Sequence, residues 1–146
     1  MLKVLIAEDD LMIADTVEEI LVECGYEVCG IARTVAEGIA LGLRHKPDLA
    51  LIDLRLADGE LGTEIASQLG TFGRLGVLYA TGNVSHLMLN AANGDACLSK
   101  PYNSADLQRS LEIVADMVAT GTASPPFPRG FRVLPSVAIA RQESPA

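Results

Sequence analysis

The stretch "ALIDLR", residues 50–55, is a short apolar run followed by an aspartate, a leucine and an arginine. Together with Leu49, the run is typical of a strand that is buried on both faces of a sheet. An isolated carboxylate next to such a run is costly unless it is paired, protonated or bound to a metal. Asp53 therefore needs partners from elsewhere in the chain.

Length, charge and cysteine content limit the class of protein and the ligands that it can bind. The chain has 146 residues, a formal net charge of −8 and three cysteines, which predicts one domain and argues against a nucleic acid as ligand. No apolar run reaches the roughly 18 residues of a membrane span, and the N-terminus lacks the pattern of a signal peptide. The cysteines have no metal-like spacing, so we expect a cytoplasmic protein with reduced thiols.

The hydrophobic pattern predicts five strands that alternate with five helices. The expected strands are residues 2–7, 26–32, 48–52, 75–80 and 96–99. The expected helices are residues 11–24, 35–46, 63–69, 85–92 and 104–119. Thr34 is expected to cap the second helix with Glu37 as its capping-box partner, and Asn103 or Ser104 to cap the last. This alternation predicts an α/β fold with a doubly wound parallel sheet and helices on both faces.

Polar residues follow four of the five predicted strands. Glu8, Asp9 and Asp10 follow the first, Asp53 the third, Thr81 the fourth and Lys100 the fifth. In such folds the functional site lies at the carboxyl ends of the strands. We therefore expect these side chains to converge at one edge of the sheet.

Carboxylates that crowd one edge repel each other, and a bound Mg²⁺ relieves this repulsion with oxygen ligands. An aspartate carboxylate can also attack phosphorus and form an acyl phosphate. The Lys100 ammonium and the Thr81 hydroxyl could then contact the phosphoryl oxygens. Taken singly, each residue has a simpler explanation: Asp9 or Asp10 could only cap the first helix, and Thr81 could belong to an ordinary turn. Their joint occurrence after different strands favours a site.

The segments "VLIAEDD", "LALIDLRL", "LYATGN" and "CLSKPYN" resemble the motifs of response-regulator receiver domains, the phosphoacceptor modules of bacterial two-component signalling. The resemblance covers residues 1–119. It implies a flavodoxin-like five-stranded sheet in the order 2-1-3-4-5. It also implies Mg²⁺ as cofactor, held by Glu8, Asp9, Asp53 and the backbone carbonyl of Arg55. Asp53 would be the phosphoacceptor, and Thr81 and Lys100 would bind the phosphoryl oxygens.

Two positions depart from the family pattern. Cys97 stands where receivers usually carry an aromatic switch residue, and Tyr79-Ala80-Thr81-Gly82 resembles the Phe-Ala-Thr-Gly receiver subgroup, in which the fourth helix is mobile. Residues 82–95 are rich in glycine and asparagine, which predicts a weak helix there. We expect Mg²⁺ and a phosphate mimic to order it.

We expect residues 120–146 to be a proline-rich C-terminal extension without an output domain. Its apolar residues favour an extended arm on its own domain or on a partner subunit over a disordered end.

The function expected from the resemblance is that of a single-domain response regulator with intrinsic self-phosphorylation and autodephosphorylation activity. Its expected partners are a sensor histidine kinase or histidine phosphotransfer protein and a downstream protein. It would signal by protein contact, act in a phosphorelay or drain phosphate, and it could form a homodimer. The alternative is a receiver-fold interaction module that takes no phosphate. A phosphatase is disfavoured because Arg55 occupies the place of its second aspartate, and no G-x-G-x-x-G motif supports nucleotide binding.

Overall fold

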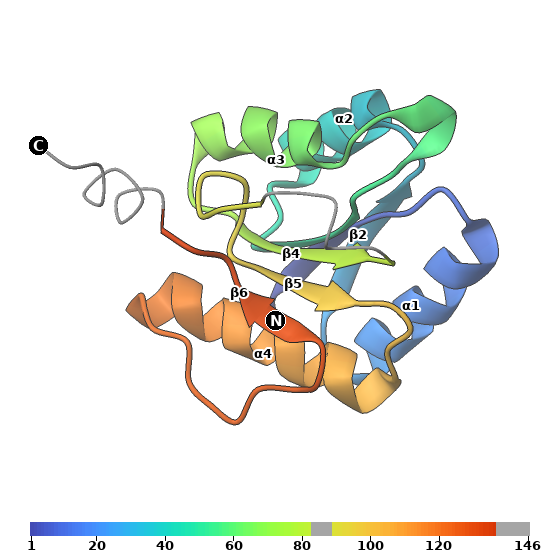
Figure 1. Cartoon of the computed structure of the whole chain (residues 1–146). Coiled ribbons are helices and arrows are strands. Elements are labelled where there is room, and N and C mark those ends of the chain that lie inside the picture. Colours follow the sequence, from blue (N-terminus) through green and yellow to red (C-terminus); the bar gives the residue numbers. More distant parts are fainter. Residues whose placement is uncertain (83–88, 137–146) are drawn as a thin grey trace, which may run out of the picture.

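A six-stranded sheet forms the centre of the computed structural model, which describes residues 1–82 and 89–136. The strands are β1 (Lys3–Ala7), β2 (Glu27–Ala32), β3 (Leu49–Asp53), β4 (Gly76–Thr81), β5 (Ala96–Ser99) and β6 (Phe131–Val133). Their order is β2-β1-β3-β4-β5-β6 (Figure 1). The first five are parallel, which confirms the predicted order 2-1-3-4-5.

The sixth strand corrects the prediction of a five-stranded sheet. β6 lies in the C-terminal extension and pairs antiparallel with β5, whose outer edge would otherwise carry unpaired backbone groups. It is only three residues long and follows a run of prolines. The hydrophobic pattern therefore gave no separate strand signal for it.

Helices cover both faces of the sheet, as predicted. They are α1 (Leu11–Glu23), α2 (Val35–His45), α3 (Thr63–Leu69) and α4 (Ser104–Thr120), with short 3-10 turns η1 (Ala57–Gly59) and η2 (Gly70–Phe72). In Figure 1, α2 and α3 lie above the sheet and α4 below it. The first half of the helix expected at residues 85–92 falls outside the described residues, and residues 89–92 are not helical. Among the described residues, no helix is long and apolar enough to span a membrane.

Two hydrophobic clusters hold these layers together, one on each face of the sheet. Alternate residues of each central strand enter opposite clusters, as in β4, where Val77 and Tyr79 face one cluster and Leu78 faces the other. Strands buried on both faces are typical of parallel sheets. The packing fixes the strand ends, and therefore the position of every side chain that follows them.

Polar side chains cap the N-termini of α2 and α4, as expected. The Thr34 hydroxyl accepts a hydrogen bond from the backbone N–H of Glu37 at 3.1 Å, and Asn103 Oδ1 accepts one from Asp106 at 2.7 Å. The Glu37 carboxylate accepts from the backbone N–H of Arg33 at 2.7 Å. Arg33 is the residue before the N-cap and not the N-cap residue of the predicted capping box. Such caps satisfy backbone donors that the first helical turn leaves without partners.

Candidate functional site

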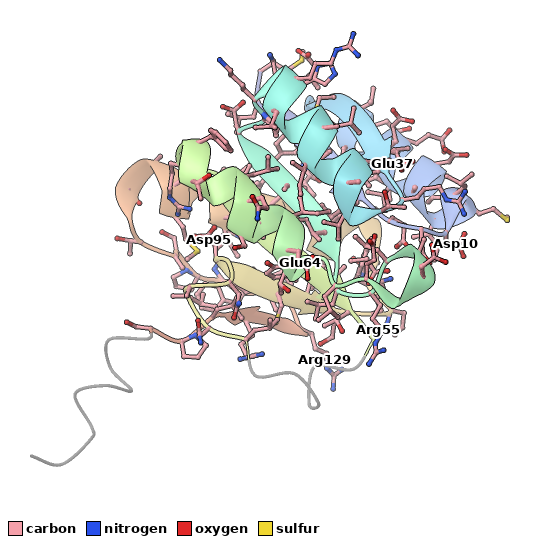
Figure 2. The ribbon with its side chains drawn as sticks, turned by 90° about the horizontal axis from the view of Figure 1, so that it is seen from above. Asp10, Glu37, Arg55, Glu64, Asp95 and Arg129 are labelled. Atoms are coloured by element: carbon pink, nitrogen blue, oxygen red, sulfur yellow. The ribbon has the colours of Figure 1, made fainter. Side chains whose placement is uncertain are left out.

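The carboxyl ends of the parallel strands meet at one edge of the sheet. Strand register places Asp53 opposite Ala80, and Thr81 opposite Ser99, the residue before Lys100. Figure 2 shows Asp10, Glu37 and Arg55 along one side of the molecule, whereas Asp95, before β5, lies on the opposite side. The backbone positions of Asp53, Thr81 and Ser99 therefore lie side by side at this edge.

Three carboxylates form an acidic cluster here, consisting of Glu8, Asp9 and Asp53. Each offers one oxygen, and the three oxygens all lie within 4.8 Å of one another. Glu8 is buried, while Asp9 and Asp53 are half-buried. Oxygen donors this close together match the ligand preference of a hard divalent cation.

Lys100 provides the positive charge of the site. Its ammonium nitrogen Nζ lies 3.0 Å from Asp53 Oδ2 and 3.3 Å from Glu8 Oε1. Partial burial lowers the pKa of Lys100, but the hydrogen bonds and charges of Asp53 and Glu8 outweigh burial and raise its pKa overall. The ammonium therefore stays protonated at neutral pH.

Glu8 is the buried carboxylate of the cluster, and its pKa is raised. Burial raises the pKa of Glu8 to about 7; the backbone N–H of Asp10 lowers it, the Asp53 charge raises it and Lys100 lowers it. The hydrogen bond from Asp10 to Glu8 Oε2 is 3.2 Å long. The local positive charge is thus insufficient to offset desolvation of this carboxylate, and an additional cation would stabilise it.

The neighbouring residues Asp9 and Asp10 have different roles in the structure. Asp10 is the N-cap of α1, and its Oδ1 accepts hydrogen bonds from Met12 at 3.0 Å and Ile13 at 3.3 Å. Asp9 instead offers an oxygen to the acidic cluster. The capping explanation therefore applies to Asp10 and not to Asp9.

Thr81 and Arg55 border the cluster. Thr81 is buried at the end of β4, and its backbone carbonyl accepts a hydrogen bond from the Lys100 N–H at 2.8 Å. The backbone N–H of Arg55 donates to Asp53 Oδ1 at 3.4 Å. The Arg55 side chain is exposed and lies at the molecular surface (Figure 2). These contacts hold the backbone on both sides of Asp53.

Two residues at the site were not found by sequence reasoning. A Cβ on Gly62 would collide with the backbone carbonyl of Asp53, and the Gly62 N–H donates to Leu54 at 2.8 Å. Arg33 Nε donates to the carbonyl of Asp9 at 3.4 Å. Arg33 directly follows β2, so its place at the same edge was a usable signal. The close approach of Gly62 has no local sequence signal.

Tyr79 and Cys97 occupy opposed positions on β4 and β5. The Tyr79 hydroxyl donates to the carbonyl of Asn93 at 2.6 Å, and its ring lies where a Cβ on Gly94 would be. Cys97 is buried, and burial raises the pKa of its thiol, while the Arg132 guanidinium beside it lowers that pKa. The tyrosine therefore anchors the chain before β5.

Comparisons with known proteins find relatives of this chain. The family model of the response regulator receiver domain matches residues 4–112. The chain is 30% identical to the transcriptional regulatory protein PdtaR of Mycobacterium tuberculosis over 83% of its own length and 60% of PdtaR. It is 30% identical to the phyllosphere-induced regulator PhyR of Methylorubrum extorquens over 72% of its own length and 40% of PhyR. The chain thus spans less than two thirds of either relative.

A solved structure shows the same fold at a similar level of identity. It is a CheY-like response regulator receiver domain protein from Methanospirillum hungatei, which is 31% identical to the chain with a TM-score of 0.73. The alignment covers 84% of this chain and 99% of that protein.

Proposed function

Because this chain belongs to the response regulator receiver domain family, we propose that it accepts a phosphoryl group on Asp53. The donor is the phosphohistidine of a sensor histidine kinase or a histidine phosphotransfer protein. One observation carries this proposal: the Lys100 ammonium lies 3.0 Å from Asp53 Oδ2, at the edge of the acidic cluster.

The reaction is a transfer between two nucleophiles. A carboxylate oxygen of Asp53 attacks the phosphorus as the bond from phosphorus to the imidazole nitrogen breaks, and the electron pair of that bond returns to the imidazole. The product is an acyl phosphate on Asp53. The Lys100 ammonium and the Thr81 hydroxyl donate hydrogen bonds to the transferring oxygens, which disperses their charge.

The residues of the acidic cluster fit Mg²⁺. Glu8, Asp9 and Asp53 would hold it, together with the backbone carbonyl of Arg55. When bound, Mg²⁺ neutralises phosphoryl oxygens and reduces their repulsion from the carboxylate. The raised pKa of Glu8 supports this assignment, because the cluster lacks sufficient positive charge of its own.

The same groups also act in the loss of the phosphoryl group. A water molecule that attacks the phosphorus of the acyl phosphate releases inorganic phosphate and regenerates the Asp53 carboxylate. The chain would thus perform its own phosphorylation and autodephosphorylation, as a signalling phosphoacceptor and not as an enzyme with a separate substrate.

An apolar groove beside Lys100 supports docking of a protein phosphodonor. The groove measures about 660 Å³ and lies between α1 and the loop from β5 to α4. Its lining includes Met12, which is 82% exposed, and Ile13 and Tyr102. A helix seated there would bring its histidine towards Asp53, which Lys100 contacts.

The signal would then pass through contact with a downstream protein, through a phosphorelay or by draining phosphate from a kinase, and two copies of the chain could associate. We place the protein in the cytoplasm, together with the phosphodonor that we propose for it.

The experiment is incubation with Mg²⁺ and phosphoramidate, a small donor with a phosphorus–nitrogen bond, followed by the intact mass. We expect the mass to rise by one phosphoryl group, and Asp53→Asn to abolish the increase. Asp58→Asn changes an exposed carboxylate in the loop that follows Asp53 and should leave the mass increase unchanged. An unchanged wild-type mass would support the alternative, a receiver-fold interaction module without phosphate.

A further inference from the structure

The C-terminal strap, residues 122–136, runs back along the edge of the sheet after α4. Arg109 on α4 holds its first part, donating hydrogen bonds to the carbonyls of Ser124 at 2.6 Å and Pro126 at 3.1 Å. The strap then forms β6 on β5. In Figure 1 this orange and red segment leaves α4 and returns beside β5.

One end of the part of the strap that pairs with β5 lies next to the acidic cluster. The backbone N–H of Ser99 donates to the carbonyl of Gly130 at 3.0 Å. Ser99 directly precedes Lys100, whose ammonium bridges Asp53 and Glu8. Any displacement of Lys100 that moves its backbone therefore acts on the hydrogen bond between Ser99 and Gly130.

The other end is attached to the chain that leads into β5. The Leu134 N–H donates to the carbonyl of Asp95 at 3.0 Å, and the Ala91 N–H donates to the carbonyl of Pro135 at 2.8 Å. The same chain segment is anchored from beneath by the Tyr79 hydroxyl through Asn93. The strap thus joins the loop at Lys100 to residues 91–95.

Few side chains hold the strap in place. Of its residues, all of which the structure describes, only Leu134 is buried, in the cluster that also contains Tyr79 and Cys97. Arg132 lies opposite Cys97, and Phe131 packs on Phe127 with ring centroids 5.3 Å apart. A short ladder with one buried anchor belongs to the weakly held part of a fold, which opens more readily than its core.

We propose that the strap covers the edge of β5 in the unphosphorylated chain and is released when Asp53 is phosphorylated, an inference that rests on the proposed function. The docked strap fits the arrangement in which Lys100 lies between the two carboxylates. A phosphoryl group moves the acceptor oxygens beyond Asp53, and Lys100 must follow them. The Ser99 hydrogen bond then loses its geometry. Release would expose the β5 edge and the site of Leu134, to which an extended apolar segment of a partner can add as a strand.

Amide hydrogen exchange followed by NMR tests the release. Protein is compared with and without Mg²⁺ and beryllofluoride, a stable mimic of the phosphoryl group, while the intact mass after phosphoramidate reports phosphorylation separately. We expect the amides of Ser99 and Leu134, which donate across the contact between the strap and the β5 segment, to exchange about tenfold faster with the mimic. The amide of Leu107, inside α4, should be unchanged.

Leu134→Ala tests the coupling from the other direction. Coupling between two sites is reciprocal, so a loosened strap should strengthen beryllofluoride binding several-fold. Phe131→Ala should act in the same sense, and Leu43→Ala, at an exposed position on α2, should have no effect. Phosphorylated protein whose strap amides stay protected, or equal affinity in all variants, would overturn this inference alone. Protein that takes up no phosphoryl group would overturn the proposed function, and the inference with it.

Discussion

Lys100 Nζ lies 3.0 Å from Oδ2 of Asp53, although the two residues are 47 positions apart in the chain. They meet because β3 and β5 both end at the same edge of the sheet, with β4 between them. The ammonium therefore neutralises part of the charge of the acidic cluster in the absence of a metal. In our proposal it competes with Mg²⁺ for the same carboxylates and turns to the phosphoryl group once Asp53 is phosphorylated.

Lys100→Ala should separate these two roles. Because the ammonium no longer competes for Glu8 and Asp53, we expect Mg²⁺ to bind several-fold more tightly. Phosphoryl transfer from phosphoramidate should slow by about ten- to a hundredfold, since one donor to the transferring oxygens is lost. Magnesium titration and the rate of mass increase measure the two effects. Arg44→Ala, an exposed change in the last turn of α2, is the control, and parallel loss of both properties would refute the competition.

Glu8 should make the stability of the Mg²⁺-free protein depend on pH. Its pKa rises from 4.5 to about 7 on folding, so the folded state binds this proton more tightly than the unfolded state. The contribution is therefore complete below about pH 4.5 and is lost as the pH rises through about 7. Urea unfolding at about pH 5 and about pH 8 should show a larger decline for wild type than for Glu8→Gln. Equal declines would mean that Glu8 is not the titrating group.

Asp9 and Asp10 give a test with two adjacent carboxylates. Asp10→Ala removes the cap of α1 and should cost about 1 kcal/mol of unfolding free energy, with little change in Mg²⁺ affinity. Asp9→Asn removes a cluster oxygen and should weaken Mg²⁺ binding at least tenfold. Because it also relieves repulsion, it should not destabilise the metal-free protein. Thermal unfolding and magnesium titration of both variants measure these effects. If Asp9→Asn lowered stability and Asp10→Ala weakened Mg²⁺ binding, the two assignments would be wrong.

Gly62 should tolerate no side chain. Its Cβ would collide with the carbonyl of Asp53, so Gly62→Ala should cost about 1–3 kcal/mol of unfolding free energy and slow phosphorylation by displacing Asp53. Gly70→Ala is the matched control, because a Cβ there meets nothing within 4 Å and its φ is −62°. If the two alanine variants behaved alike in urea unfolding, the close approach would be unimportant.

Much of the fold could be predicted because its elements are periodic and buried. The five parallel strands and their order followed from apolar runs that alternate with helical patterns, together with the family resemblance. β6 could not be predicted, since three residues after a proline-rich segment have no period of their own. Their pairing depends on the free edge of β5, which exists only once the sheet has formed.

For the site, it could be predicted which residues lie close together, but not their detailed contacts. Asp53 ends β3 and Lys100 directly follows β5. Because both strands belong to one parallel sheet, the topology alone predicts that these two residues lie close together. The choice of Asp10 over Asp9 as the helix cap depends on the exact backbone at the end of β1. The contact between Gly62 and Asp53 depends on how the loop after β3 closes. The local sequence predicts neither this contact nor the choice of helix cap.

The position of the phosphoryl group tests the central claim most directly. Protein phosphorylated with phosphoramidate and Mg²⁺ is reduced with borohydride, which converts an aspartyl phosphate to homoserine, and its peptides are sequenced by mass spectrometry. The account predicts homoserine at position 53 alone, and none when Mg²⁺ is replaced by a chelator. Homoserine at another aspartate, or no conversion in a folded and Mg²⁺-loaded protein, would contradict it.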